Sequence, residues 1–250
     1  MEDATIQATA NEYIPDPKTE TEWVIQGFFQ VIGQRLGDPT RAQHLIEVIR
    51  THAAALEAAY QGWVLDEQAH YNLTLGAVVL AAYRALQPTM PWDEALALLR
   101  AAFVEPLRDT MRQGTAGWLD HAPDPYAALV GVSKARERHF FGQAFTFERP
   151  RDDDRAYFLD VARCLWHSFF VAEGAPELTP IFCAFDANWI DAIDPDRHGV
   201  RFSRPTTLGH GGPLCPFHFY RVAPATGAPA DATTVMSGVA DAASATGGEG

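Results

Sequence analysis

All three cysteines of the chain lie between residues 164 and 215, and each has a polar partner three residues later. The pairs are Cys164 with His167, Cys183 with Asp186, and Cys215 with His218. On a helix, positions i and i+3 share a face, so a pair can point two functional groups at one place. On a strand such positions lie on opposite faces, which separates the third pair. A cysteine can serve as a nucleophile, as a zinc ligand, or as a buried side chain that packs like a small hydrophobe. The spacing leaves all three roles open.

Two short segments between the second and third cysteine carry further polar groups. Asp186, Asn188 and Trp189 bring a carboxylate, an amide and an indole together, although a tryptophan also serves as a core residue. Glu177 follows Pro176, and in the first turn of a helix its carboxylate would favour the helix dipole. Substrate binding and these structural roles are therefore both open at these positions.

Arg204 and Thr207 precede a glycine-rich turn, residues 209–212, that contains His210. Glycines allow backbone N–H groups to approach a ligand closely. The planar guanidinium of an arginine suits a carboxylate. His210 is either a general acid, since an imidazole exchanges protons near neutral pH, or an exposed turn residue. The chain contains none of the common serine-hydrolase, metalloprotease, dinucleotide, Walker A or EF-hand motifs.

The elements that must position these groups change in type near Gly142. Before it, helical spacing and Asp-Pro capping signals predict about five helices, with a kink at Pro106. Their predicted ranges are 20–37, 38–62, 66–88, 91–114 and 124–141. After it, alternation predicts four strands, and helical spacing predicts two helices between the second and the third. The strands are expected at 144–149, 156–162, 200–208 and 216–222, and the helices at 163–174 and from 176 onward.

The order ββααββ predicts an α+β fold, in which a helical bundle packs with a small antiparallel sheet that carries a helix pair. We expect a disordered arm at 1–18, a helical part at 19–142, an α+β catalytic part at 143–222 and a disordered tail at 223–250. No linker separates the two middle parts, so we expect them to share one core.

Composition limits the class of partner. The chain has 250 residues, 47% of them hydrophobic, which suits a globular protein. Its net charge of −13 disfavours binding to nucleic acid or to an anionic membrane. It has no apolar run of about 20 residues and no apolar leader, so we expect a cytoplasmic protein with reduced thiols. A small molecule is the expected partner, and a homo-oligomer is left open.

Five segments together resemble one family, that of L-2-amino-thiazoline-4-carboxylic acid hydrolase. They are Arg163–Phe170, Gly174–Leu178, Ile181–Trp189, Val200–Leu208 and Gly212–Phe219. The three cysteines, the GxPEL and FCxFDxNW strings and the closing CxFxF string occur in the same order as in the family. The resemblance is close from Phe158 to Phe219, and the helical part agrees in general character. Pro216 departs from the pattern, because the family's closing CDFxF-type string has an acid there.

The resemblance implies a hydrolase that opens a small carboxylated C–N heterocycle, a cyclic amidine such as 2-amino-thiazoline-4-carboxylate or a related ring. The chemistry needs a nucleophile and an acid for the leaving atom. Cys183 is the expected nucleophile or metal ligand, and Asp186 the base or the partner of the amidinium. Arg204 is expected to hold the substrate carboxylate, with His210 or His218 as general acid. Further substrate-binding candidates are Glu177, Asn188, Trp189, Thr207, Cys164 and Cys215.

Two alternatives stay open at this point. A zinc-bound hydroxide held by some of Cys164, Cys183, Cys215 and His218 would replace the thiol as nucleophile. No cofactor is certain, and zinc is the one considered. A non-catalytic protein would use the same cysteine-lined pocket for small-ligand binding or assembly. Convergence of the cysteines with Asp186 would favour the enzyme.

Overall fold

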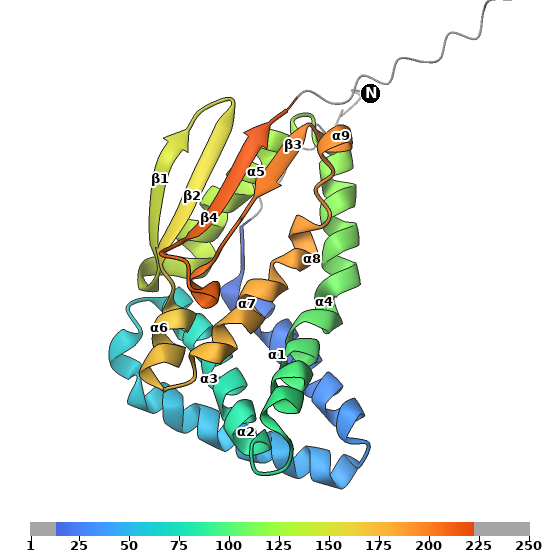
Figure 1. Ribbon diagram of the computed structural model, residues 1–250, viewed down its shortest axis with the longest axis vertical. Coiled ribbons are helices and arrows are strands. Elements are labelled where there is room, and N and C mark those ends of the chain that lie inside the picture. The colour runs from blue at the N-terminus through green and yellow to red at the C-terminus, as the bar shows by residue number, and fades with distance from the viewer. Residues whose placement is uncertain (1–13, 223–250) are drawn as a thin grey trace, which may run out of the picture.

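The computed structural model describes residues 14–222 and combines a group of packed helices with a four-stranded sheet (Figure 1). The helices α1, α2, α3 and α6 lie at one end of the molecule and the sheet at the other, while α4 runs along the side from one to the other. The α+β prediction is confirmed. The predictions for residues 1–13 and for the tail at 223–250 lie outside the described residues. Of the predicted arm, residues 17 and 18 belong to the first helix.

Five long helices precede the sheet: α1 (Pro17–Leu36), α2 (Pro39–Ala59), α3 (Glu67–Leu86), α4 (Trp92–His121) and α5 (Pro125–Arg136). Three of them begin at an Asp-Pro step. The carboxylates of Asp16, Asp38 and Asp124 each accept backbone N–H groups of the first turn, and the proline occupies the first helical position. Sequence therefore locates these starts within a few residues.

Helix α4 continues to His121, so the end predicted near Gly114 is wrong. A glycine ends a helix most readily in the left-handed conformation, and Gly114 does not adopt it. The last turns of α4 gain a separate anchor, because Leu119 is buried in a second apolar cluster beneath the sheet. Burial there outweighs the cost of a glycine within the helix, which is about 1 kcal/mol.

Gly27 lets α1 approach α4 at Pro106. A Cβ atom added at Gly27 would lie 2.5 Å from the Cβ of Pro106, far inside van der Waals contact. The proline ring therefore fills the space that a side chain on α1 would take. The close approach buries Val24 and Phe28 on the same face of α1.

We expect Gly27→Ala to destabilise the protein by about 1–3 kcal/mol, because the added methyl group forces the two helices apart. Gly33→Ala is the matched control in the same helix, since its Cβ would lie at an ordinary 3.9 Å from the Cβ of Ala42. That control should stabilise the protein by roughly 0.5–1 kcal/mol, through helix propensity alone. Urea denaturation of both variants measures the difference, and equal effects at the two positions would contradict the close packing.

The sheet is antiparallel throughout, in the order β1-β2-β4-β3. Its strands are β1 (Thr146–Asp152), β2 (Ala156–Arg163), β3 (Val200–Ser203) and β4 (Cys215–Arg221). All four predicted strands exist. The third is shorter than expected, and it ends before Pro205, which has no N–H group to donate to a ladder. Arg204 and Thr207 therefore lie in a connecting loop, outside the sheet.

Short helical segments make up the rest. Those within the sheet-bearing half are α6 (Leu165–Ala172), η4 (Pro176–Leu178), α7 (Thr179–Phe185), α8 (Ala187–Ile190), α9 (Pro195–His198) and η5 (Leu208–His210). The others are η1 (Gln61–Trp63), the π-helical turn η2 (Glu137–Phe141) and η3 (Gly142–Ala144). The helix predicted from residue 176 is thus divided into three pieces, η4, α7 and α8.

Two apolar clusters hold the fold together. The larger one joins α1–α4 to α6 and α7 and includes Val161 and Cys215 of the sheet. The smaller one lies between the sheet, α5 and the end of α4. Phe147 and Phe217 pack against both clusters, so they mark the boundary between them.

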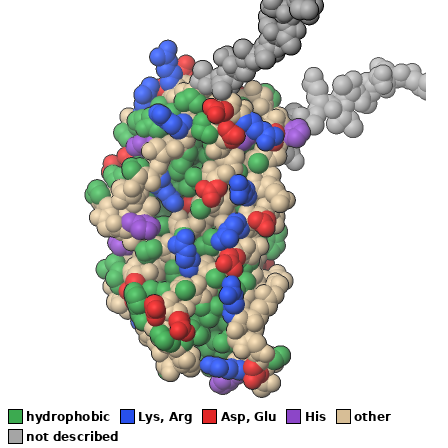
Figure 2. All heavy atoms as spheres, turned by 45° about the vertical axis from the view of Figure 1, so that its right-hand side comes forward, with side chains coloured by type: hydrophobic (Ala, Val, Ile, Leu, Met, Phe, Trp, Pro, Cys, Tyr) green, Lys and Arg blue, Asp and Glu red, His purple; other side chains and the backbone are tan. Residues whose placement is uncertain are grey.

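One face of the molecule shows no sign of a nucleic-acid partner. On the face shown in Figure 2, acidic and basic side chains are interspersed over the surface. Such a face offers no continuous basic stripe for a phosphate backbone. Among residues 14–222, no helix combines the length and the apolar character needed to cross a membrane.

Candidate active site

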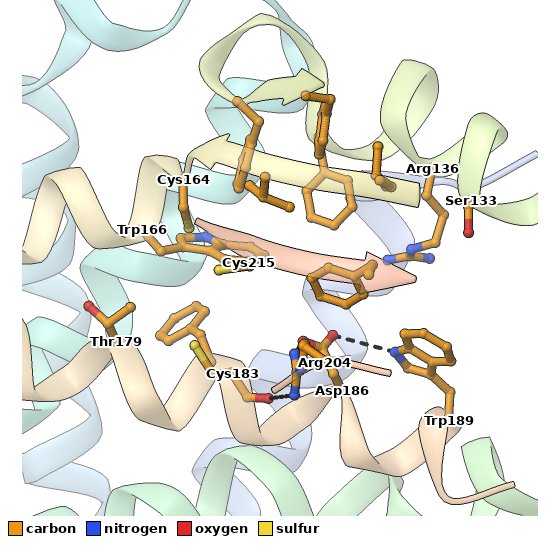
Figure 3. Close-up of a pocket in the computed structure, with 17 residues that line it drawn as sticks. Ser133, Arg136, Cys164, Trp166, Thr179, Cys183, Asp186, Trp189, Arg204 and Cys215 are labelled. Carbon is orange, nitrogen blue, oxygen red and sulfur yellow. Dashed lines mark hydrogen bonds and ion pairs between the residues drawn. The ribbon is translucent and has the colours of Figure 1, made fainter. Parts of the chain in front are cut away.

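A cavity of about 120 Å³ lies where the two apolar clusters meet, between the inner face of the sheet, α5 and α7 (Figure 3). Most of its wall is aromatic or aliphatic. The lining residues with chemical function are Ser133, Arg136, Cys164, Thr179, Cys183, Asp186, Trp189, Arg204 and Cys215. Figure 3 shows the three cysteines at one end and Arg136 with Trp189 at the other, while Asp186 and Arg204 lie between them.

The structure brings the three cysteines together from three elements. Cys164 is the residue before α6, Cys183 lies on α7, and Cys215 is the first residue of β4. All three are free thiols that line the one cavity. The three cysteines therefore converge as expected, although each comes from a different element.

The loop after β3 wraps around two of these sulfurs. The backbone N–H of Leu208 donates to Cys215 Sγ at 3.1 Å. A Cβ atom at Gly209 would lie 3.0 Å from Cys183 Sγ and 2.9 Å from Thr179 Cγ2, so this position requires glycine. The hydroxyl of Thr207 hydrogen-bonds with Cys183. The glycine-rich turn thus brings backbone amides close to the thiols.

Burial keeps the thiols protonated in the cavity. It raises the pKa of Cys164 to about 12 and that of Cys215 to about 11. The pKa of Cys183 is also raised by burial, and hydrogen bonds from Thr207 and from the Gly209 amide oppose this shift. A thiolate at Cys183 therefore needs a group that removes the proton.

Asp186 lies at the end of α7 and forms an ion pair with Arg204. Trp189 Nε1 donates to Asp186 Oδ1 at 3.4 Å, and Arg204 Nη2 donates to the carbonyl oxygen of Cys183 at 2.9 Å. Burial raises the pKa of Asp186, while the guanidinium of Arg204 acts in the opposite direction. A carboxyl group with a raised pKa next to a thiol is suited to acid–base chemistry.

Arg136 is a site residue that the sequence did not indicate. It is the last residue of α5, where a basic side chain commonly serves the helix dipole, so its type carried no functional signal. It lines the cavity together with Ser133, three residues earlier on the same helix face. Its guanidinium pairs with Glu20 of α1 at 2.9 Å and stacks on Phe140. The field of Arg136 also lowers the pKa of Asp186.

His218 lies outside the cavity. Side chains alternate along β4, so Cys215 and Phe217 face the cavity while His218 faces the other side of the sheet. There its Nε2 lies 2.8 Å from Asp160 Oδ1, and its ring stacks on Phe158. We therefore leave His218 out of the proposed chemistry.

Pro216 also lies away from the cavity, because it is next to Cys215 on β4 and pairs in register with Asp160. At this point β4 has a neighbour on one side only, since β3 pairs with residues 218–221. A proline is tolerated in a strand at such a position. The departure from the family pattern therefore removes no group from the cavity wall.

Two other sequence candidates have structural partners. Glu177 Oε1 accepts a hydrogen bond of 2.7 Å from the hydroxyl of Tyr83, which ties the GxPEL turn to α3. Asn188 is buried and donates to the carbonyl oxygen of Val104 at 3.0 Å, which ties α8 to α4. Neither residue lines the cavity. His210 is exposed on η5, and its Nδ1 shares a hydrogen bond of 2.8 Å with Thr207 Oγ1.

The described residues do not assemble a metal site of the usual kind. Within residues 14–222, no three His, Cys, Asp or Glu side chains are placed so that they could hold a metal ion. The ligand set considered from sequence included His218, which faces away from the three cysteines. We therefore assign no step to a metal.

Comparison with known proteins identifies the family. The family model of L-2-amino-thiazoline-4-carboxylic acid hydrolase matches residues 71–219. The chain belongs to this family. The resemblance of the five segments is thereby confirmed, and the match of the hydrolase family extends back to α3 in the helical part. Each residue lining the cavity lies within this family match. No curated protein and no solved structure gives a significant match to the chain.

Proposed function

We propose that this protein hydrolyses a small carboxylated cyclic amidine, such as 2-amino-thiazoline-4-carboxylate, in the cavity that contains Cys183. One observation carries the proposal: the region matched by the hydrolase family encloses a cavity where a thiol, a carboxyl group and two guanidinium groups meet. These groups are the ones needed for attack on an amidine carbon, for proton transfer and for carboxylate binding.

The size of the cavity supports a single small ring. An engineered protein cavity of about 150 Å³ binds benzene, and the volume here is about 120 Å³. The wall includes Trp166, Phe182 and Phe217, whose flat faces suit a planar, cationic amidine. A substrate much larger than a five-membered ring with one carboxylate would not fit without movement of the walls.

The distribution of charge favours one orientation of the substrate. The guanidinium group of Arg136 lies at the end of the cavity opposite the thiols, and that of Arg204 lies between the two ends. A substrate carboxylate directed to the guanidinium groups would leave the amidine carbon near Cys183. Arg204 also holds Asp186, so a change at Arg204 should affect turnover as well as affinity.

The proposed reaction has two steps. Cys183 Sγ, as a thiolate, forms a bond to the amidine carbon, and the bond from that carbon to a ring heteroatom breaks. Protonated Asp186 gives its proton to the departing heteroatom. A water molecule then attacks the same carbon, Asp186 takes a proton from it, and the Sγ–carbon bond breaks. The thiolate and protonated Asp186 are restored, and the net change is the addition of one water to the ring.

A non-catalytic role in small-ligand binding is the second candidate. The observation that favours it is the burial of the thiols, which raises their pKa values and so lowers the fraction of reactive thiolate. Such a protein would bind the same carboxylated ring without opening it.

Ring opening is tested with the purified protein and a panel of cyclic amidines, lactams and cyclic ureides, assayed with and without added zinc. We expect 2-amino-thiazoline-4-carboxylate or a close analogue to be converted to a product heavier by one water, detected by mass spectrometry. The same ring without its carboxylate is the matched control, and it should react much more slowly. Calorimetric binding of the rings with no conversion in any condition would instead establish the binding role.

A further inference from the structure

The exposed turn η5 connects the thiol of Cys183 to the surface of the molecule. Thr207 Oγ1 and His210 Nδ1 share a hydrogen bond of 2.8 Å. Thr207 is 4% exposed and its hydroxyl also hydrogen-bonds with Cys183, whereas His210 is exposed. One buried hydroxyl group thus lies between a cavity thiol and an imidazole in contact with solvent.

Backbone hydrogen bonds fix this geometry. The carbonyl oxygen of Thr207 accepts from the N–H of His210 at 3.0 Å and from the N–H of Gly212 at 2.9 Å. The turn therefore closes on itself and holds the imidazole over the threonine hydroxyl. Gly209 lies against Cys183 Sγ, where there is no room for a side chain, so the same turn is also fixed against α7.

We propose that Thr207 and His210 form a proton path that carries the proton of the Cys183 thiol to solvent. In this path the S–H bond of Cys183 breaks and the proton passes to Thr207 Oγ1. The proton of that hydroxyl passes to His210 Nδ1, and the imidazole exchanges it with water. Thr207 is regenerated, and no other reactant is needed. The catalytic use of the path rests on the proposed function, because only a nucleophilic role requires the thiolate.

Other groups that face Cys183 have different tasks. Asp186 and Arg204 are ion-paired with each other, and the thiols of Cys164 and Cys215 are themselves buried. In the two-step reaction Asp186 serves the leaving heteroatom and the attacking water, so the thiol needs a separate acceptor for its proton. His210 is a positioning residue in this sense, since it acts through Thr207.

Alkylation of Cys183 tests the path without a substrate. The double variant Cys164→Ala, Cys215→Ala leaves Cys183 as the one thiol of the chain. In this background, the rate of iodoacetamide labelling is measured from pH 6 to pH 11 by mass spectrometry of the Cys183 peptide. Labelling is slow compared with proton exchange, so its rate follows the fraction of thiolate. We expect His210→Gln and Thr207→Val each to lower the rate at pH 7 by about tenfold, because the imidazole that has taken the proton stabilises the thiolate through the Thr207 hydroxyl by about the free energy of one hydrogen bond. The difference should vanish at high pH, where hydroxide removes the proton.

Two controls separate proton transfer from a change in structure. Thr207→Ser keeps the hydroxyl group and should keep the rate near that of the background protein. His121→Gln changes an exposed histidine at the end of α4, remote in sequence from the turn, and should have no effect. A loss of rate that is equal at every pH, or unchanged rates in His210→Gln and Thr207→Val, would overturn the proton path.

The outcome also distinguishes this proposal from the proposed function. If no ring is opened but the pH profile changes as expected, the path stands and the hydrolytic activity fails. If rings are opened and the profiles of all variants coincide, the activity stands and the path fails.

Discussion

Replacement of Cys183 by alanine is expected to abolish ring opening. The variant keeps the cavity and its charges but lacks the sulfur atom that we propose attacks the amidine carbon. Loss of a covalent nucleophile commonly lowers turnover by about 10³-fold or more. Since the walls and both guanidinium groups remain, the ring should still bind, and calorimetry should give an affinity within a few-fold of the unmodified protein.

Two further variants compare Cys183 with Cys164, another thiol of the same cavity. Cys183→Ser retains a hydroxyl group of similar size, and its low acidity should leave activity near that of Cys183→Ala. Cys164→Ala removes a thiol from the same cavity, but one whose pKa burial raises to about 12. That variant should keep most of its turnover. Near-normal turnover in Cys183→Ala, with loss in Cys164→Ala, would assign the chemistry to the other thiol.

Asp186→Asn is expected to lower turnover by roughly 10²–10⁴-fold, the range for loss of a general acid–base group. The amide preserves the shape of the carboxyl group and a contact for Trp189, but it cannot exchange a proton. The pH dependence follows from the raised pKa of Asp186. The attack of water needs the carboxylate, so this second step should be lost as pH falls through that raised pKa. The first step needs protonated Asp186, so it should be lost as pH rises through the same raised pKa.

The asparagine variant should lack this acidic limb, and a full pH–rate profile of both proteins checks the expectation. Asp160→Asn is the matched control, because this carboxylate lies on the outer face of the sheet with His218. It should leave the profile unchanged. An acidic limb that persists in Asp186→Asn would show that another group carries the proton.

Local rules of helix and strand geometry predicted which side chains of the candidate site share a face. Helical spacing placed Cys183 and Asp186 on one face, and strand alternation separated Cys215 from His218, as the structure shows. Convergence of Cys164, Cys183 and Cys215 depends on how α6, α7 and β4 pack, which no local rule states. The family resemblance was needed to expect it.

The presence of Arg136 in the cavity wall could not be predicted from the sequence. The side chain reaches the cavity because α5 packs behind the sheet and passes into the π-helical turn η2, which brings Phe141 to the same cavity. In an α-helix, residues five apart would not share a face. Nothing in the residues 133–141 marks this change of helix type. The contacts of Thr207 with His210 and Cys183 also depend on the start of a turn that the sequence did not predict, because the predicted strand continued through Thr207 while β3 ends at Ser203.

The fold was predictable in its elements and less so in their extents. The Asp-Pro steps at Asp38 and Asp124 predicted two helix starts, because capping is a local interaction, whereas the same step at Asp16 was assigned to the arm. Helix ends and strand lengths depend on tertiary burial, and α4 continues past Gly114 because Leu119 has a separate core to enter. The ends of such helices and strands are decided by the part of the same chain against which they pack.

The position of the cavity at the boundary of the two apolar clusters would couple the proposed substrate binding to the folding of the chain. Phe147 and Phe217 pack against both clusters and line the cavity between them. A ring bound as we propose would make dispersion contacts with the side chains of both clusters at once. In the proposed function, each substrate molecule would therefore act as an additional core residue, one that the chain does not encode and that the reaction would remove at every turnover.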